Sequence, residues 1–274
     1  LKKIIIPDSV KQIEEYAFSE TGLLREIHIP TKLRGEISGE PWNNLVGVVF
    51  WKDILMIDNY IYDQTNKKII RYIGTTPNAK IDIPSELVKD GKKYPVECIS
   101  SSAFLDANIS SINVPSTIKK IEPYTFSEIH KPVDIIFSSD SKLKEIPNNA
   151  FENSNIKSII LPNTIEKIDK NAFKNTNLEN ITIPDSVTHI NDHAFFMSNL
   201  KSINFGENSK LSFIGYGAFQ NTKIKSISIP NSVESLGGNS FANSSLENIS
   251  FKKNSKLEKK LLCEVEHELN AHEL

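Results

Sequence analysis

Apolar residues alternate with polar ones in short stretches along most of the chain, and a proline often follows. The pattern is clearest at 181–184 (Ile-Thr-Ile-Pro) and at 227–230 (Ile-Ser-Ile-Pro). Alternation with a period of two predicts a β-strand whose apolar side chains all point to one face. Proline lacks the amide donor that a sheet ladder requires, so it predicts the end of each strand.

A second half follows each strand, and the whole unit reads L-x-x-I-x-I-P-x-S-V-x-x-I-x-x-x-A-F-x-N-[ST]. The spacing between successive Ala-Phe phenylalanines is 22, 25, 22, 22, 24 and 22 residues from Phe104 onward. Repeats of roughly 20–29 residues with this apolar spacing are typical of the leucine-rich repeat class. The phenylalanines that mark the units are Phe18, Phe104, Phe126, Phe151, Phe173, Phe195, Phe219 and Phe241.

No single unit can bury its apolar face alone, so the units are expected to stack and share one core. This predicts an α/β solenoid of the leucine-rich repeat type. We expect a right-handed superhelix with a parallel β-sheet on its concave face, and short turns or helices on the other side. The Asn after each Ala-Phe pair is expected to lie in a turn and to bond nearby backbone.

The pattern divides the chain into four regions. Residues 1–50 are expected to form a short repeat array whose last unit is degenerate. Residues 51–80 break the pattern and predict a β-hairpin joint with its turn at 64–67. The main array is expected to span 81–257. Apolar residues at helical spacing predict a helix in 258–274, which either caps the open end of the stack or begins a further region.

The repeated I-P-x-S-V-x-x-I-x-x-x-A-F motif resembles the BspA-type leucine-rich repeat family of bacterial and protist cell-surface proteins. The resemblance covers most of the chain. It implies extracellular, cell-surface display and adhesion to a host or neighbouring-cell surface protein or to an extracellular-matrix protein, with glycans as a further class. It implies no catalytic residues and no cofactor. Because Leu1 enters in mid-repeat, we expect the chain to be part of a longer protein.

Composition limits the classes of partner that the chain is expected to bind. The net charge is −2 and the pI about 6.4, which gives no electrostatic reason to expect a nucleic acid. No apolar run approaches the ~20 residues of a membrane-spanning helix, so we expect no membrane insertion. The two cysteines, Cys98 and Cys263, are too few for a disulfide framework.

Catalytic and metal-binding motifs are weak. No G-x-S-x-G or Cys/His arrangement is present, so the chain is not expected to be an enzyme. The tail contains Cys263, His267 and His272, a weak candidate for a metal site. The two histidines are five residues apart, whereas H-E-x-x-H places them four apart on one helix face. A solvated acidic helix face is the alternative interpretation.

Two surfaces are candidates for binding. The outward positions of the strands would form a ladder of hydroxyl and amide groups, suited to a protein or a glycan. The alternative is that these residues are simply small enough to pack side by side. The predicted ladder comprises Ser158, Ile160, Asn180, Thr182, Ser202, Asn204, Ser226 and Ser228.

The hairpin joint is the other candidate. Trp42 and Trp51 lie at or beside it, together with Phe50 and three tyrosines, Tyr60, Tyr62 and Tyr72. Tryptophan and tyrosine are common interface anchors. They would otherwise form the small core of the joint itself.

These observations favour a non-enzymatic binding module that acts through the concave sheet or the aromatic joint. A structural stalk that holds another domain away from the cell is the first alternative. An accessory domain of an enzyme, whose catalytic part lies outside these residues, is the second.

Overall fold

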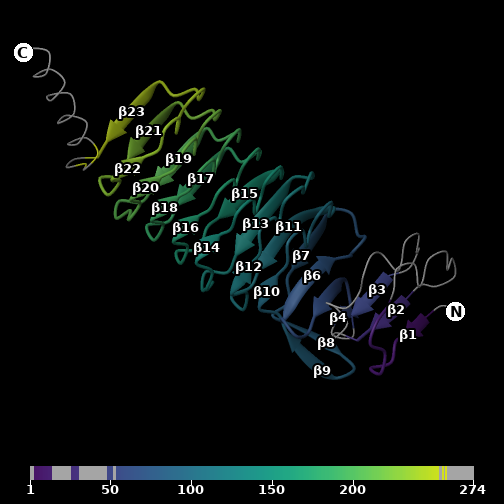
Figure 1. The fold of residues 1–274 in the computed structure, drawn as a ribbon. Coiled ribbons are helices and arrows are strands. Elements are labelled where there is room, and N and C mark those ends of the chain that lie inside the picture. The colour runs from purple at the N-terminus through teal and green to yellow at the C-terminus, as the bar shows by residue number, and fades with distance from the viewer. Residues whose placement is uncertain are drawn as a thin grey trace, which may run out of the picture.

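The computed structural model describes residues 3–13, 26–30, 48–51, 54–252, 255 and 257. Every element found in this part of the chain is a β-strand. From β7 to β23 the strands, apart from β8 and β9, follow one another in coils stacked along a single axis (Figure 1). The predicted tail helix (258–274) lies outside the described residues, as do Trp42 and the candidate metal ligands.

The I-x-I segments form the first line of strands, as the alternation predicted. They pair in parallel and in register, so that Ile112 lies opposite Ile135 and Ile181 opposite Ile203. The strands are β7 (Ala79–Asp82), β11 (Ile109–Val114), β13 (Val133–Phe137), β15 (Ile156–Ile160), β17 (Asn180–Ile183), β19 (Ser202–Phe205), β21 (Ser226–Ile229) and β23 (Asn248–Phe251).

This line of strands is not one continuous sheet. The hydrogen-bonded groups are β7 to β15, β17 with β19, and β21 with β23. The ladder is therefore interrupted between β15 and β17 and again between β19 and β21.

A tight turn begins at the strand-ending prolines Pro115, Pro162, Pro184 and Pro230, and leads to a second, shorter line of strands. The amide of Val187 donates to the carbonyl oxygen of Pro184 at 3.1 Å, and Val233 donates in the same way to Pro230 at 3.2 Å. The second line also pairs in parallel, and β14 to β22 form one sheet. Its strands are β10 (Cys98–Ile99), β12 (Lys120–Ile121), β14 (Glu145–Ile146), β16 (Lys167–Ile168), β18 (His189–Ile190), β20 (Phe213–Ile214) and β22 (Ser235–Leu236).

The expectation of short helices opposite the sheet, and with it the α/β assignment, is wrong for the described residues: the solenoid is built of β-strands and turns. The Ala-Phe segment of each coil contains two left-handed residues four positions apart, such as Asn171 (φ 58°) and Asn175 (φ 54°). A right-handed helix requires negative φ at every position, so it cannot include them. The segment is a turn instead. In this turn the amides of Asn171, Phe173 and Asn175 donate to carbonyl oxygens of the next coil, at 2.7–3.2 Å.

Asparagine recurs after Ala-Phe mainly because it tolerates a positive φ. The expected side-chain bonds to nearby backbone are replaced by bonds between coils. The Nδ2 of Asn175 donates to the Oδ1 of Asn153 at 2.9 Å, and the Nδ2 of Asn153 donates to the carboxylate of Glu128 at 2.6 Å.

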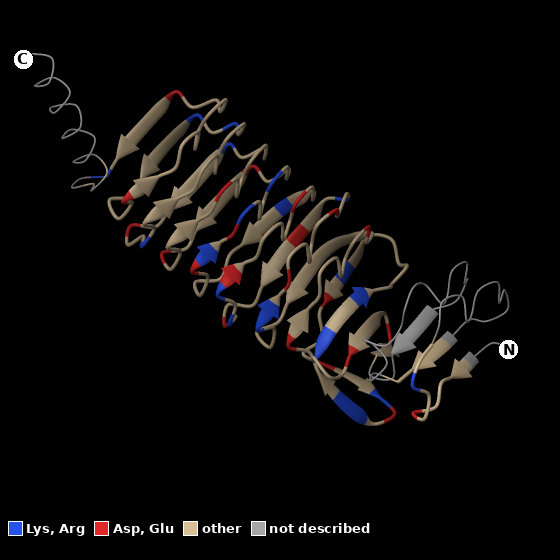
Figure 2. Ribbon diagram, viewed as in Figure 1, with Lys and Arg blue, Asp and Glu red and all other residues tan. Residues whose placement is uncertain are grey.

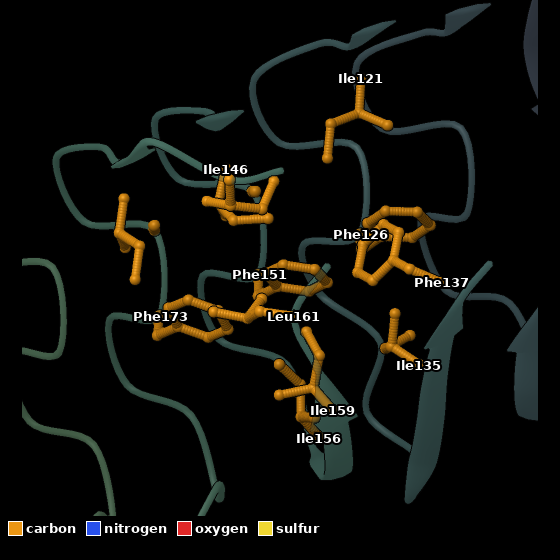
Figure 3. Packing of buried hydrophobic residues seen from close by; sticks show 14 of the residues in the cluster. Ile121, Phe126, Ile135, Phe137, Ile146, Phe151, Ile156, Ile159, Leu161 and Phe173 are labelled. Atoms are coloured by element: carbon orange, nitrogen blue, oxygen red, sulfur yellow. The ribbon is translucent and has the colours of Figure 1, made fainter. Parts of the chain in front are cut away.

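The core is a continuous stack of aromatic rings flanked by aliphatic side chains (Figure 3). Ring centroids of successive coils lie 5.0–6.0 Å apart from Tyr72 through Phe104 to Phe241. The six phenylalanines of this column from Phe104 to Phe219 are fully buried. From Phe104 to Phe241 the predicted line of phenylalanines is thus the centre of the solenoid, whereas Phe18 lies outside the described residues.

The stack begins at an antiparallel unit. Strands β4 (Ile54–Ile57), β5 (Tyr60–Asp63) and β6 (Lys68–Tyr72) pair in turn, which confirms the two strands predicted on either side of 64–67. Strand β6 then pairs in parallel with β10. The hairpin thereby provides the first edge on which the short strands assemble. The proposed division into domains stays a prediction.

Two smaller sheets complete the described part. Strands β1 (Lys3–Ile5), β2 (Glu26–Ile29) and β3 (Val48–Trp51) form a parallel sheet within the predicted first array. Strands β8 (Glu86–Lys89) and β9 (Lys92–Pro95) form a hairpin.

Candidate binding surface

The outward positions of the first line of strands form an exposed face. In β17 the burial alternates, with Asn180 and Thr182 exposed and Ile181 and Ile183 buried. Strand β21 repeats the same alternation. The predicted ladder residues Ser158, Ile160, Asn204, Ser226 and Ser228 are likewise exposed, and Ser202 is half-buried.

Neighbouring strands exchange hydrogen bonds through these outward side chains. The hydroxyl of Ser202 donates to the Oδ1 of Asn180, and that of Ser158 donates to a carboxylate oxygen of Asp134, both at 2.6 Å. Part of the ladder therefore holds the strands together. These polar atoms retain lone pairs or donors for a partner, since a hydroxyl and an amide each offer several hydrogen-bonding positions.

Charge is distributed unevenly over this face. Strands β17, β19, β21 and β23 contain no charged residue, whereas β7 presents Lys80 and Asp82 and β13 presents Asp134. Figure 2 shows the same separation, with these later strands uncoloured and the charges gathered at the bends. Ion pairs between successive coils lie at the edge of this face, including Lys201–Glu179 at 2.6 Å and Lys225–Glu247 at 3.7 Å.

Two isoleucines interrupt the polar ladder. Ile160 of β15 is 76% exposed and Ile136 of β13 is 46% exposed. They lie directly opposite each other in the parallel pairing of these strands. Ile160 was among the predicted outward residues, whereas Ile136 was not, because it lies in the uninterrupted apolar run Ile135-Ile-Phe137. The alternation of the strand nevertheless predicts that Ile136 points outward, because it lies between the inward residues Ile135 and Phe137.

A depression lies beside Ile160, where the ladder between β15 and β17 is interrupted. It has a volume of about 320 Å³. We call it the Ile160 notch, and its lining residues are Ile159, Ile160, Leu161, Asn163, Asn180, Ile181, Thr182, Pro184 and Asn204.

A second exposed group lies on the turn side of the coils and was not recognised in the sequence. The ring of His193 contacts those of Phe196 and Tyr216 edge to face, with centroids 5.2 and 5.4 Å apart. Tyr216 is 47% exposed and the neighbouring Met197 is 51% exposed. Both stand at positions that are polar in other coils, and this departure from the repeat is the feature of the sequence that could have identified them.

The three tyrosines of the aromatic joint belong to the core, whereas the side chains of Trp42, Phe50 and Trp51 lie outside the described residues. Tyr60, Tyr62 and Tyr72 are at most 8% exposed. Burial raises the pKa of Tyr62 to about 12 and raises that of Tyr72 as well. Trp51 ends β3, but its side chain lies outside the described residues, so the two tryptophans stay predicted binding residues.

Titratable groups in the described part pair with one another across coils. Hydrogen bonds from Lys119 and Lys67 hold the pKa of Glu97 below its usual value. Burial raises the pKa of the Cys98 thiol, which is not in a disulfide. No group of three or more His, Cys, Asp or Glu side chains suited to a metal ion occurs among the described residues. Cys263, His267 and His272 lie outside them.

Over the described ranges, the structure contains no helix with the length and hydropathy needed to cross a membrane.

The repeated coils and their two lines of parallel strands define a repeat protein of the β-solenoid class. The model of the BspA type leucine rich repeat region matches six copies, over residues 1–65, 97–211 and 166–264. These matches cover well over half of the chain, so the chain belongs to this family. The leucine-rich repeat family is generally non-catalytic.

Two solved structures, from Faecalibacterium and Eubacterium, support the same fold. A leucine rich cell surface protein from Faecalibacterium prausnitzii aligns with 25% identity and a TM-score of 0.59, over 74% of this chain and 55% of that one. A leucine-rich repeat protein from Eubacterium ventriosum aligns with 18% identity and a TM-score of 0.50, over 77% and 65% of the two chains. The pneumococcal vaccine antigen PcpA aligns with 25% identity and a TM-score of 0.49, over 74% and 50%.

The chain thus spans between half and two thirds of the length of these proteins. No match was found among curated proteins.

Proposed function

We propose that the chain is a non-enzymatic, protein-binding module of a cell-surface protein, and that it binds through the exposed face of β13 to β23. The supporting observation is the exposed, uncharged row of hydroxyl and amide groups along β17 to β23, together with the exposed Ile136 of β13 and Ile160 of β15 before it. A periodic surface of this kind offers many modest hydrogen bonds over a long contact, with apolar anchors beside the polar row.

The cell-surface location is part of this proposal. Its support is family membership and the description of the Faecalibacterium protein as a cell surface protein. Extracellular-matrix proteins and proteins of neighbouring or host cells are the partners proposed, with glycans as a second class. Trp42 and Trp51 stay candidates for a separate contact at the joint.

The test is a binding panel of immobilised extracellular-matrix proteins together with a glycan array. Wild type is compared with Thr182→Lys and Ser226→Lys, which place a charge on the exposed face. Asn148→Lys is the matched control, because it adds the same charge on the turn side, at a position that is lysine (Lys170) in the next coil.

A partner bound by wild type and by the control, but weakened by both face variants, is the expected result. Equal binding by all four proteins would place the contact elsewhere. Absence of any binding would favour the structural stalk, which needs only the rigid stack of coils.

A further inference from the structure

The geometry points to the Ile160 notch as the specificity-determining centre of this face. We propose that it receives one large apolar side chain from an uncharged, extended segment of a partner protein. This inference rests on the proposed function and adds the chemical class of the ligand.

The notch exists because two neighbouring strands separate. Strands β15 and β17 belong to different hydrogen-bonded groups, whereas β13 with β15 and β17 with β19 are paired. At this interruption Ile159, Leu161 and Ile181, which otherwise belong to the core, form part of the lining. The lining of the notch therefore includes apolar side chains of the core as well as Ile160.

An apolar side chain is the ligand group that these apolar lining residues favour. Ile160 is one of them and is the most exposed of the large hydrophobic residues in the described part, at 76%. Covering a solvent-exposed isoleucine and the apolar side chains beside it removes apolar surface from water, which favours binding. A sugar hydroxyl placed against these side chains would lose hydrogen bonds to water without replacement. The chemistry thus favours a protein side chain over a glycan.

The polar rim indicates what surrounds that side chain. Asn163, Asn180, Thr182 and Asn204 also line the notch, and no lining residue is charged. Side-chain amides can donate to and accept from the backbone of an extended segment. A charged residue of the partner would be buried here without a counter-charge, which costs free energy. The matching segment is uncharged at and beside its apolar residue.

The experiment is selection of a phage-displayed library of random twelve-residue peptides on the wild-type chain. We expect the enriched peptides to share one large apolar residue without charged neighbours. Ile160→Asn should lower the affinity for the selected peptides at least about tenfold, which is the effect of truncating a hot-spot side chain of an interface. Asn is found at the equivalent position of other strands, for example Asn204, so the fold should tolerate it.

Val88→Asn is the control, because Val88 is also an exposed aliphatic residue (52%) but lies on the β8–β9 hairpin. It should leave peptide binding unchanged. Failure to enrich any peptide, enrichment of charged peptides, or equal binding by Ile160→Asn would each overturn the notch proposal. Self-association that Ile160→Asn abolishes, measured by sedimentation, would also overturn it in favour of a second copy of the chain.

The two proposals can be separated. If a protein from the binding panel binds wild type and Ile160→Asn equally but is weakened by Ser226→Lys, the notch proposal fails and the proposed function holds. If wild type binds neither peptides nor any protein of the panel, both fail.

Discussion

The rings of Phe173 and Phe195, one coil apart, stack with centroids 5.0 Å apart and planes within 2° of parallel. Both are fully buried, and each coil of the main array contributes one ring to the same column. The stability of each coil therefore depends on the rings of its neighbours, which is the expected behaviour of a linear repeat protein.

Phe173→Ala should destabilise the protein by about 3–5 kcal/mol, because it leaves a cavity in the ring column. Denaturant unfolding measures the loss, and hydrogen exchange should locate it in the adjoining coils. Ile160→Ala is the matched apolar truncation on the surface and should change stability by no more than about 0.5 kcal/mol. A loss below about 1 kcal/mol for Phe173→Ala would contradict the ring column as the main source of stability.

Met197→Asn should stabilise the protein by about 0.5–1 kcal/mol. Met197 has a φ of 57° and is 51% exposed, so it bears left-handed strain without burying its side chain. Other coils have asparagine there, including Asn221 (φ 59°). The reciprocal change, Asn221→Met, should destabilise by a similar amount in thermal unfolding. Stability changes of the same sign in the two variants would show that φ does not decide this position.

Glu122→Gln should lower stability at pH 7, and the difference from wild type should vanish in acid. Burial alone would raise the pKa of Glu122, but bonds from Lys68 Nζ (3.1 Å), the Ser101 amide (3.1 Å) and the Ser100 hydroxyl (3.0 Å) outweigh it and lower the pKa below 4.5. A lowered folded-state pKa means that the stabilisation is present above the unfolded value and lost as the pH falls through the folded one.

Unfolding curves of wild type and Glu122→Gln between pH 7 and pH 3 measure this effect. Glu247→Gln is the control, since it removes an exposed ion pair of 3.7 Å that should contribute little. A stability difference that stays constant with pH would rule out the carboxylate as its source.

Tyr62→Phe should cost about 1–2 kcal/mol and loosen the β8–β9 hairpin. The buried Tyr62 hydroxyl donates to the carbonyl oxygen of Pro95 at 2.5 Å, and the variant would leave that oxygen without this donor. Hydrogen exchange should accelerate at Val96, whose amide donates to Ser85, relative to amides of β17. Unchanged exchange at Val96 would show that the hairpin is held by its other contacts.

The sequence by itself determined the repeat, the I-x-I strands, the proline turns and the Ala-Phe core. These features are local, since alternation, proline and a period near 22 residues each restrict the backbone within one unit. Because the unit is repeated and one unit cannot bury its apolar face alone, the units must stack to bury residues such as Ile181, Ile183 and Phe195. The outward row of Asn180 and Thr182 followed from the same alternation.

Only the tertiary structure decided the features that depend on how coils meet. The Ala-Phe segment is a turn and not a helix, because left-handed residues such as Asn171 and Asn175 direct amides to the next coil. The separation of β15 from β17 and the pairing of Ile136 with Ile160 have no counterpart in the pattern of a single unit. Such features arise from register between units, and periodicity specifies each unit but not the spacing between one coil and the next.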